Sequence, residues 1–227
     1  MKTRLSFGAA LALTALASVP AADTPKVSAV FVDPDSPAHT EIRDVGERAI
    51  NRLGMTLMNE VTAAVAKSGA TKAVDVCHLK ALPLTGEIVS GMPRITGVKR
   101  TSQKLRNTAN TPDEAEKLAL AHVEKEIAAG RLPKVLVQRI HQPGGKPEWR
   151  VYRPVGVAPQ CVTCHGPRES LDPGLAARLA EKYPDDQATG YASGQWRGLI
   201  RVTVEDAPPP SAVPAKPAPP AKTPKKA

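Results

Sequence analysis

The segment CVTCH (161–165) places two thiols and an imidazole within five residues. When such a segment makes about one helical turn, both cysteines reach one edge of a porphyrin, and each thiol can add across a vinyl group to form a thioether. The histidine is then held next to the ring and presents a nitrogen to the iron. C-x-x-C-H is the attachment signature of haem c, so Cys161, Cys164 and His165 predict one covalent haem with His165 as an iron ligand.

Two other uses of these thiols fit the sequence less well. A redox disulfide between Cys161 and Cys164 would need a thioredoxin-like βαβ setting, which the surrounding sequence lacks. A structural zinc site would need a fourth ligand and usually has a second C-x-x-C pair, whereas the third cysteine of the chain, Cys77, is isolated far upstream. The sequence therefore favours haem attachment.

Cys77 is the odd cysteine and lies in the segment VDVCHLKA (74–81). If the other two cysteines hold haem, its thiol forms an intermolecular disulfide, is an inert buried side chain, or binds a metal. The residue taken alone favours a small buried hydrophobe. His78 follows directly and is the competing ligand if this segment reaches an iron.

The methionines bear on the type of cytochrome. Small electron-carrier cytochromes c attach haem near the N-terminus and take a downstream methionine as second ligand, whereas here the last methionine, Met92, precedes the motif. The cytochrome c′ type places its motif near the end of a four-helix bundle, whereas this chain predicts strand, motif, short helix and strand. Both common types therefore fit poorly.

The two ends of the chain differ in composition from the part between them. Residues 1–22 have a positively charged start, a short apolar run and small residues at a cleavage site, which is the layout of a secretory signal peptide. Residues 207–227 contain eight prolines, six alanines and four lysines, which predicts a disordered tail. Residues 23–206 are then predicted to form one c-type haem-binding domain.

Most of the net charge of +9 lies at these ends, because the signal peptide carries +2 and the tail +4, which leaves +3 for residues 23–206. The charge therefore does not indicate a nucleic-acid partner. The N-terminal apolar run is too short and too rich in alanine for a retained anchor, which needs about 20 apolar residues. We expect a cleaved, periplasmic protein without stable membrane insertion, whose partner is a redox or signalling protein.

Periodicity predicts an α+β fold. Apolar residues at steps of three and four indicate a long amphipathic helix over residues 38–67, and a second helix over 71–82 is expected to stop at Pro83. A third helix is expected to begin with Thr111 as N-cap, Glu114 completing a capping box, and to close at Gly130. Alternating residues predict an antiparallel sheet with helices on one face; its strands are 134–141, 148–154 and 196–205, and a short helix covers 173–182.

The chain resembles the Tll-type mono-haem c-type cytochromes, exported proteins with a PAS-like haem-binding domain. The resemblance covers about residues 40–204 and rests on four ordered pieces: VDVCHLKA (74–81), VKRTSQKLRNTANTPDEAE (98–116), YRPVGVAPQCVTCHG (152–166) and YPDDQATGYASGQWRGLIRVTV (183–204). One departure is that VCHLKALPLTG carries more large apolar residues after the cysteine than the family pattern.

The resemblance implies a PAS-like antiparallel sheet with a long N-terminal helix and further helices packed around the haem. It implies His165 as the proximal iron ligand and Cys77 as the distal one. A thiolate stabilises ferric iron and lowers the reduction potential relative to His/Met ligation. Because two protein ligands would fill both axial positions, a redox sensor is favoured, a periplasmic electron-transfer cytochrome is the alternative, and a peroxidase-like enzyme fits least.

The run KRTSQKLRN (99–107) carries four cations in eight residues, Lys99, Arg100, Lys104 and Arg106. Arginine matches a carboxylate with two parallel hydrogen bonds, and haem carries two propionates. We expect Arg100, Lys104 and Arg106 to be cofactor-binding residues, with a solvated basic loop as the alternative.

Overall fold

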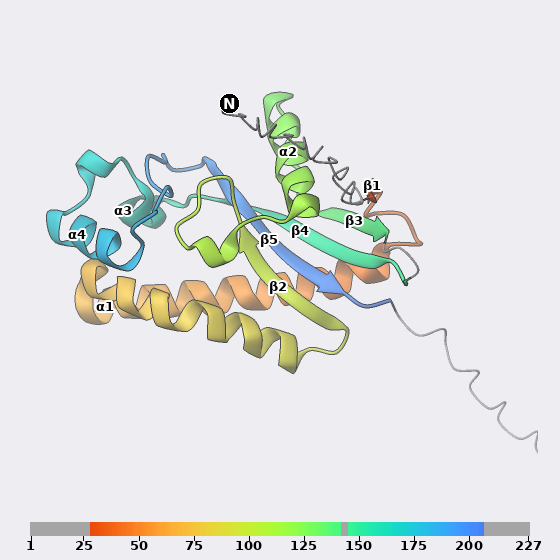
Figure 1. The fold of residues 1–227 in the computed structure, drawn as a ribbon, viewed down its shortest axis with the longest axis horizontal. Coiled ribbons are helices and arrows are strands. Elements are labelled where there is room, and N and C mark those ends of the chain that lie inside the picture. Colours follow the sequence, from red (N-terminus) through yellow and green to blue (C-terminus); the bar gives the residue numbers. More distant parts are fainter. Residues whose placement is uncertain (1–27, 142–144, 207–227) are drawn as a thin grey trace, which may run out of the picture.

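The fold is centred on a five-stranded antiparallel sheet (Figure 1). The computed structural model describes residues 28–141 and 145–206, so the predicted signal peptide and tail lie outside the described residues. The strand order is β1-β3-β4-β5-β2. The strands are β1 (Ser28–Val32), β2 (Ile95–Thr101), β3 (Leu136–His141), β4 (Glu148–Gly156) and β5 (Trp196–Val204).

The described part of the chain adds four α-helices to this sheet, and the α+β fold class with a long N-terminal helix is confirmed. They are α1 (Thr40–Gly91), α2 (Glu114–Ala128), α3 (Val162–His165) and α4 (Pro173–Lys182). Single 3₁₀ turns precede α2, α3 and α4; they are η1 (Thr108–Asn110), η2 (Pro159–Cys161) and η3 (Arg168–Ser170). Among the described residues, no helix combines the length and apolarity that crossing a membrane requires.

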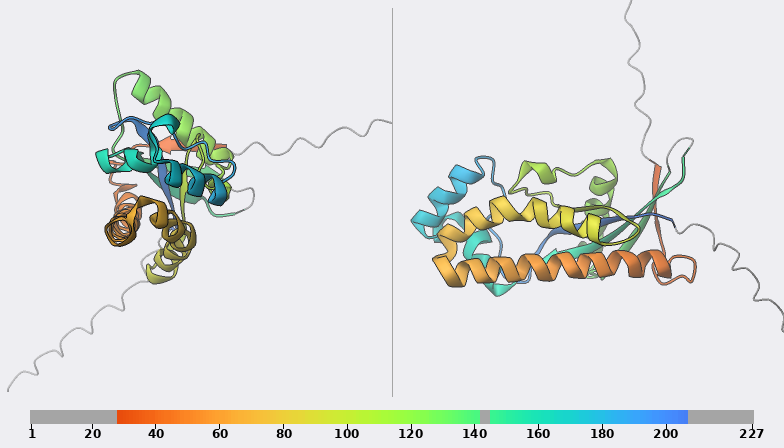
Figure 2. Two further views of the ribbon diagram at one scale, coloured as in Figure 1. Left: turned by 90° about the vertical axis from the view of Figure 1, so that its left-hand side faces the viewer. Right: turned by 90° about the horizontal axis from the view of Figure 1, so that it is seen from below.

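Helix α1 is bent into two arms at Gly69, whose φ of 77° and ψ of 166° leave the helical region. The two arms run side by side in Figure 2, and Lys80 Nζ donates to Glu60 Oε2 across them at 2.7 Å. The predicted first helix end is therefore confirmed, but the predicted stop at Pro83 is wrong. The second arm continues to Gly91 because Pro83 is exposed, so water can reach the freed carbonyl, and Ile88 beyond it is buried in the core.

Helices cover both faces of the sheet, so the prediction of helices on one face is wrong. On one face, Ile50 and Leu53 of α1 pack in a cluster with Val151 of β4. On the other, Leu120 of α2 packs in a cluster with Tyr152 of β4 (Figure 1). Because successive residues of a strand point to opposite faces, the consecutive apolar pair at 151–152 needs a partner layer on each side.

The N-cap of helix α2 lies two residues later than predicted. Asp113, not Thr111, is the N-cap: its carboxylate accepts from the Glu116 backbone N–H, and the Glu116 side chain accepts from the Asp113 N–H. Thr111 does not cap α2, because its hydroxyl and its N–H both donate to the Thr108 carbonyl at the end of η1. Gly130, with φ of 75°, follows the end of the helix as predicted.

The predicted hairpin, last strand and short helix are confirmed as β3–β4, β5 and α4. Strands β1 and β2 were not predicted. Strand β2 contains the first part of the basic run, and it pairs with β5 so that Arg100 lies opposite Ile200. This pairing brings the basic run and the C-terminal strand together at one end of the sheet.

Candidate cofactor site

A cavity of about 810 Å³ lies at this end of the sheet. Both arms of α1, the ends of β2, β4 and β5, and the segment around α3 and α4 contribute to its wall. All four residues expected to attach or ligate haem line it: Cys77, Cys161, Cys164 and His165. The volume is in the range of natural ligand and cofactor pockets. The fold thus brings together chemistry-bearing residues from two distant segments.

The CVTCH segment folds as the turn that its spacing predicts. Pro159 starts η2, the N–H of Cys161 donates to the Ala158 carbonyl at 2.9 Å, and α3 continues directly to His165. Cys161 and Cys164 are free thiols, both partly buried, and both line the cavity. Two thiols on one turn facing one cavity are arranged to react with a single ligand.

His165 is held in one orientation by the loop that follows α4. Its Nδ1 lies 2.7 Å from the Ala188 carbonyl oxygen, which can only accept, so Nδ1 carries the proton and Nε2 is left as the basic nitrogen. Burial lowers the pKa of His165 to about 4, the positive charge of Arg106 adds to this, and the Ala188 hydrogen bond opposes both. The imidazole is therefore neutral near pH 7, which is the form that binds a metal.

Arg106 connects three segments around His165. Its Nε donates to Asp186 Oδ2 at 3.0 Å, and its Nη2 donates to the carbonyls of Cys164 at 2.6 Å and Ala188 at 3.3 Å. Asp186 Oδ1 in turn accepts from the Ala188 N–H at 2.8 Å. Arg106 and Asp186 therefore fix the carbonyl that orients His165, a role that the sequence did not reveal for either residue.

Cys77 lies on the second arm of α1 and is partly buried. Burial raises the pKa of its thiol, while the positive charges of Arg100 and Arg106 lower it. His78 is not among the residues that line the cavity; its ring instead makes an edge contact with Tyr183, with ring centroids 5.2 Å apart. Of the two competing ligands, it is Cys77 that faces the cavity.

Comparison with known proteins identifies the relationship. A family model described as Tll0287-like matches residues 39–205. The chain belongs to the Tll0287-like family. A search of solved structures found the crystal structure of the cyanobacterial heme-protein Tll0287, with a TM-score of 0.53 and 23% sequence identity over 74% of this chain and 96% of that chain. At this identity the likeness concerns the fold. A search of curated proteins found no match.

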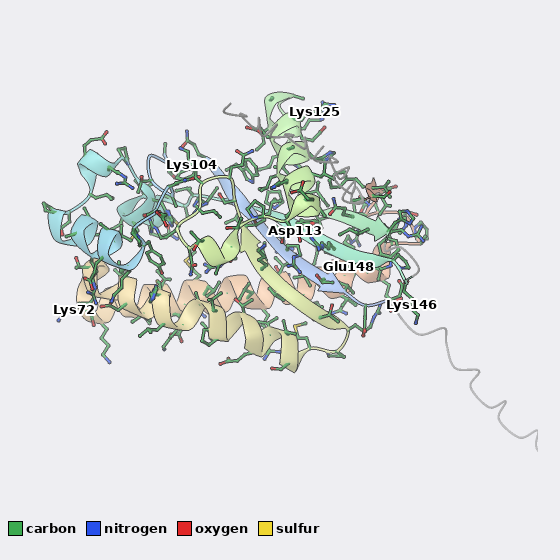
Figure 3. All side chains as sticks on the ribbon, viewed as in Figure 1. Lys72, Lys104, Asp113, Lys125, Lys146 and Glu148 are labelled. Atoms are coloured by element: carbon green, nitrogen blue, oxygen red, sulfur yellow. The ribbon has the colours of Figure 1, made fainter. Side chains whose placement is uncertain are left out.

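In this member of the Tll0287-like family, the four cations of the basic run have different surroundings. Lys99 Nζ donates to Glu116 Oε2 and to the Thr111 carbonyl, both at 2.6 Å, beside α2. Arg100 lines the cavity, and its burial lowers its pKa. Lys104, labelled in Figure 3, is exposed. Its Nζ lies 5.2 Å from the centre of the Tyr191 ring, and it is not among the lining residues.

Arg197 is a further cavity residue that sequence reasoning missed. It lies on β5, its Nη1 donates to Ser102 Oγ at 2.5 Å, and its guanidinium lies 5.4 Å from the centre of the Tyr191 ring. Burial lowers its pKa. A single arginine in a strand pattern gives no signal of its own. Only the pairing of β5 with β2, which places Leu199 opposite Thr101, brings it to the cavity.

Proposed function

We propose that this protein is an exported mono-haem c-type cytochrome in which Cys161 and Cys164 attach one haem and His165 and Cys77 ligate its iron. The observation that carries the proposal is that all four side chains, from segments more than eighty residues apart, line one cavity. Membership of the Tll0287-like family supports it, since the heme-protein Tll0287 shares the fold.

The residues present fit such a group. The CVTCH turn offers two free thiols, and His165 offers a neutral imidazole with Nε2 unprotonated. Cys77 offers a third thiol; burial raises its pKa, and the positive charges of Arg100 and Arg106 oppose that rise. When bound, the haem iron would supply one-electron redox chemistry. Ligation by Cys77 would favour the ferric form and a reduction potential below that of His/Met cytochromes.

We propose a redox sensor or redox-responsive module that acts in the periplasm through a separate signalling partner. Two protein ligands leave no iron position for peroxide, so the chain is proposed not to be an enzyme. The position of Cys77 supports sensing, because it lies on the arm of α1 that follows the bend at Gly69. A change in how tightly Cys77 is held would act on that arm, which lies on the surface of the molecule (Figure 2).

The alternative is a periplasmic electron-transfer cytochrome. Gln160, which precedes the first cysteine of the motif, and Thr163, which lies between the two cysteines, are exposed, so an attached ring would have one edge near the surface. Rapid electron exchange with a small-molecule donor would favour this carrier. Slow exchange, together with a spectral shift when a small ligand is added, would favour the sensor.

The test uses full-length protein produced in a host that assembles c-type cytochromes. We expect the intact mass to exceed that of the polypeptide by one haem, with residues 1–22 removed, and the pyridine haemochrome spectrum to be of the c type. The double variant Cys161→Ala/Cys164→Ala should carry no covalent haem. A wild-type mass without a macrocycle would contradict the proposal.

The same preparation tests the second ligand. Cys77→Ser should keep its covalent haem, change the ferric absorption spectrum and raise the reduction potential, because a thiolate donor is lost. His78→Ala, the substitution of its neighbour on the same arm, should leave the spectrum unchanged. If Cys77→Ser has the wild-type spectrum, the assignment of Cys77 fails; if His78→Ala changes it instead, His78 is the ligand.

A further inference from the structure

Two guanidinium groups line the cavity without a carboxylate partner among the described residues, those of Arg100 and Arg197. The buried Nε of Arg197 makes no hydrogen bond within residues 28–141 and 145–206. The other shielded arginines near this end of the sheet are paired, Arg106 with Asp186 and Arg201 with Glu116. Arg100 and Arg197 are therefore the exceptions.

A shielded cation without a counter-charge is costly, because the protein interior does not replace the water that the charge has lost. Folded proteins accept this cost where a ligand supplies the missing anion. Since both groups belong to the wall of the cavity, that anion belongs to whatever fills it. The two cations come from neighbouring strands, Arg100 from β2 and Arg197 from β5. These strands are paired from Ile95 opposite Val204 to Thr101 opposite Leu199.

The free atoms of Arg197 match a carboxylate. Ser102 Oγ accepts from Nη1 of Arg197 and also donates to the Arg197 carbonyl at 2.7 Å. These two hydrogen bonds fix both the side chain and the backbone of Arg197. The buried Nε remains without a hydrogen bond among the described residues. It lies on the side of the guanidinium fork that Nη2 completes, the side that binds a carboxylate with two parallel hydrogen bonds.

We propose that Arg197 and Arg100 bind the two propionate carboxylates of the haem, one each. This inference rests on the proposed function. It assigns the acidic end of the cofactor to the β2–β5 end of the cavity and leaves Arg106 as a positioning residue for His165. Lys99 and Lys104 take no part, because Lys99 is paired with Glu116 and Lys104 is exposed.

Arg197 provides the sharper test, because the charge of Arg100 also acts on the Cys77 thiol. The chain offers a matched control: Lys104 and Arg197 are both cations over the Tyr191 ring, at 5.2 and 5.4 Å, but only Arg197 lines the cavity. Arg197→Gln and Lys104→Gln therefore remove the same charge from the same ring. Only the first removes the proposed partner of a propionate.

Both variants are prepared as holoproteins and compared with wild type by resonance Raman spectroscopy and by spectroelectrochemical titration at several pH values. We expect Arg197→Gln to shift the propionate bending bands and lower the reduction potential, because a cation near the haem acids is lost. The pH range in which the potential depends on pH should move upward. Lys104→Gln should change none of these, and Arg197→Lys should shift the bands while keeping most of the potential.

Wild-type propionate bands in an Arg197→Gln protein that still carries covalent haem would overturn the inference. If Arg197→Gln does not accumulate, Arg197→Lys decides the question, since it retains the charge and loses the fork; unshifted bands in that variant would equally contradict us. A wild-type protein without covalent haem is a different result, because it defeats the proposed function itself.

Discussion

At the scale of single residues, the Asp186 side chain links Arg106 to the segment that orients His165. Asp186 is buried. One of its carboxylate oxygens accepts from Arg106, and the other accepts from the Ala188 N–H. The Ala188 carbonyl accepts from His165 Nδ1. Asp186 therefore controls the direction of the imidazole without touching it.

Asp186→Asn should loosen this arrangement, because the amide keeps one acceptor but leaves the Arg106 cation without an anionic partner. We expect a loss of about 2–3 kcal/mol in the free energy of unfolding, measured by denaturant titration. In holoprotein, the electron paramagnetic resonance spectrum should broaden as His165 samples more orientations. Asp185→Asn, at the exposed neighbouring carboxylate, should change stability by less than about 0.5 kcal/mol. Equal effects of the two substitutions would contradict this role.

The residues of the candidate site divide into those that local sequence reveals and those that it does not. Cys161, Cys164 and His165 form a motif whose spacing alone states its chemistry, and the turn they form is local. Asp186 and Arg197 each depend on a partner far away in the sequence, Arg106 at 80 residues and Ser102 at 95. No spacing in the chain encodes such a contact, so these residues become visible only when the strands are paired.

At the scale of elements, the start of α2 joins a helix cap to the sheet. The carboxylate of Asp113, which Figure 3 labels, accepts from the Glu116 N–H. Arg150 of β4 donates to both its oxygens at 2.9 and 2.8 Å. Burial alone would raise the pKa of Asp113, but the Glu116 hydrogen bond and the Arg150 charge outweigh it and lower the pKa. The ionised form is therefore the one that the fold stabilises.

Because the folded-state pKa of Asp113 lies below that of the unfolded chain, its charge stabilises the fold above about pH 4. That contribution is lost as the pH falls through the folded-state value. Asp113→Asn keeps the cap but removes the charge, so it should cost up to about 1 kcal/mol at pH 7, kept small by solvent exposure, and progressively less below pH 4. Urea unfolding of both proteins across this range measures the difference. A cost that is the same at pH 7 and at the acid end would contradict the expectation.

Where the sequence prediction of an element was wrong or missing, contacts with distant parts of the chain override the local propensity. Helix propensity predicts a stop at Pro83, yet burial of Ile88 carries the arm onward at the cost of one hydrogen bond. Strand β2 was not predicted because residues 97–101 include a glycine and two cations, for which local propensity favours a loop. Pairing with β5 overrides that preference. Elements with strong local patterns, such as α4 and β4, were correctly predicted.

At the scale of the whole molecule, the first arm of α1 lies tightly against the sheet near its start and lines the cavity further along. The close approach occurs at Gly46, where a Cβ atom would lie 2.5 Å from both Cβ and Cγ2 of Val151 on β4. Val151 is fully buried. Beyond this point, Leu57, Val61 and Val65 of the same arm line the cavity.

Gly46→Ala should therefore force the helix away from the sheet or shift the backbone of β4 at Val151. Such overpacking costs about 1–3 kcal/mol, which exceeds the roughly 0.5–1 kcal/mol that alanine gains over glycine inside a helix. Gly86→Ala is the matched control, because Gly86 lies on the second arm of α1, is exposed and has no atom within 4 Å of the added Cβ. We expect Gly46→Ala to lower, and Gly86→Ala to raise, the midpoint of thermal unfolding. If both substitutions raise it, the first arm does not rest on β4 through Gly46, and the wall of the cavity is not set by that contact.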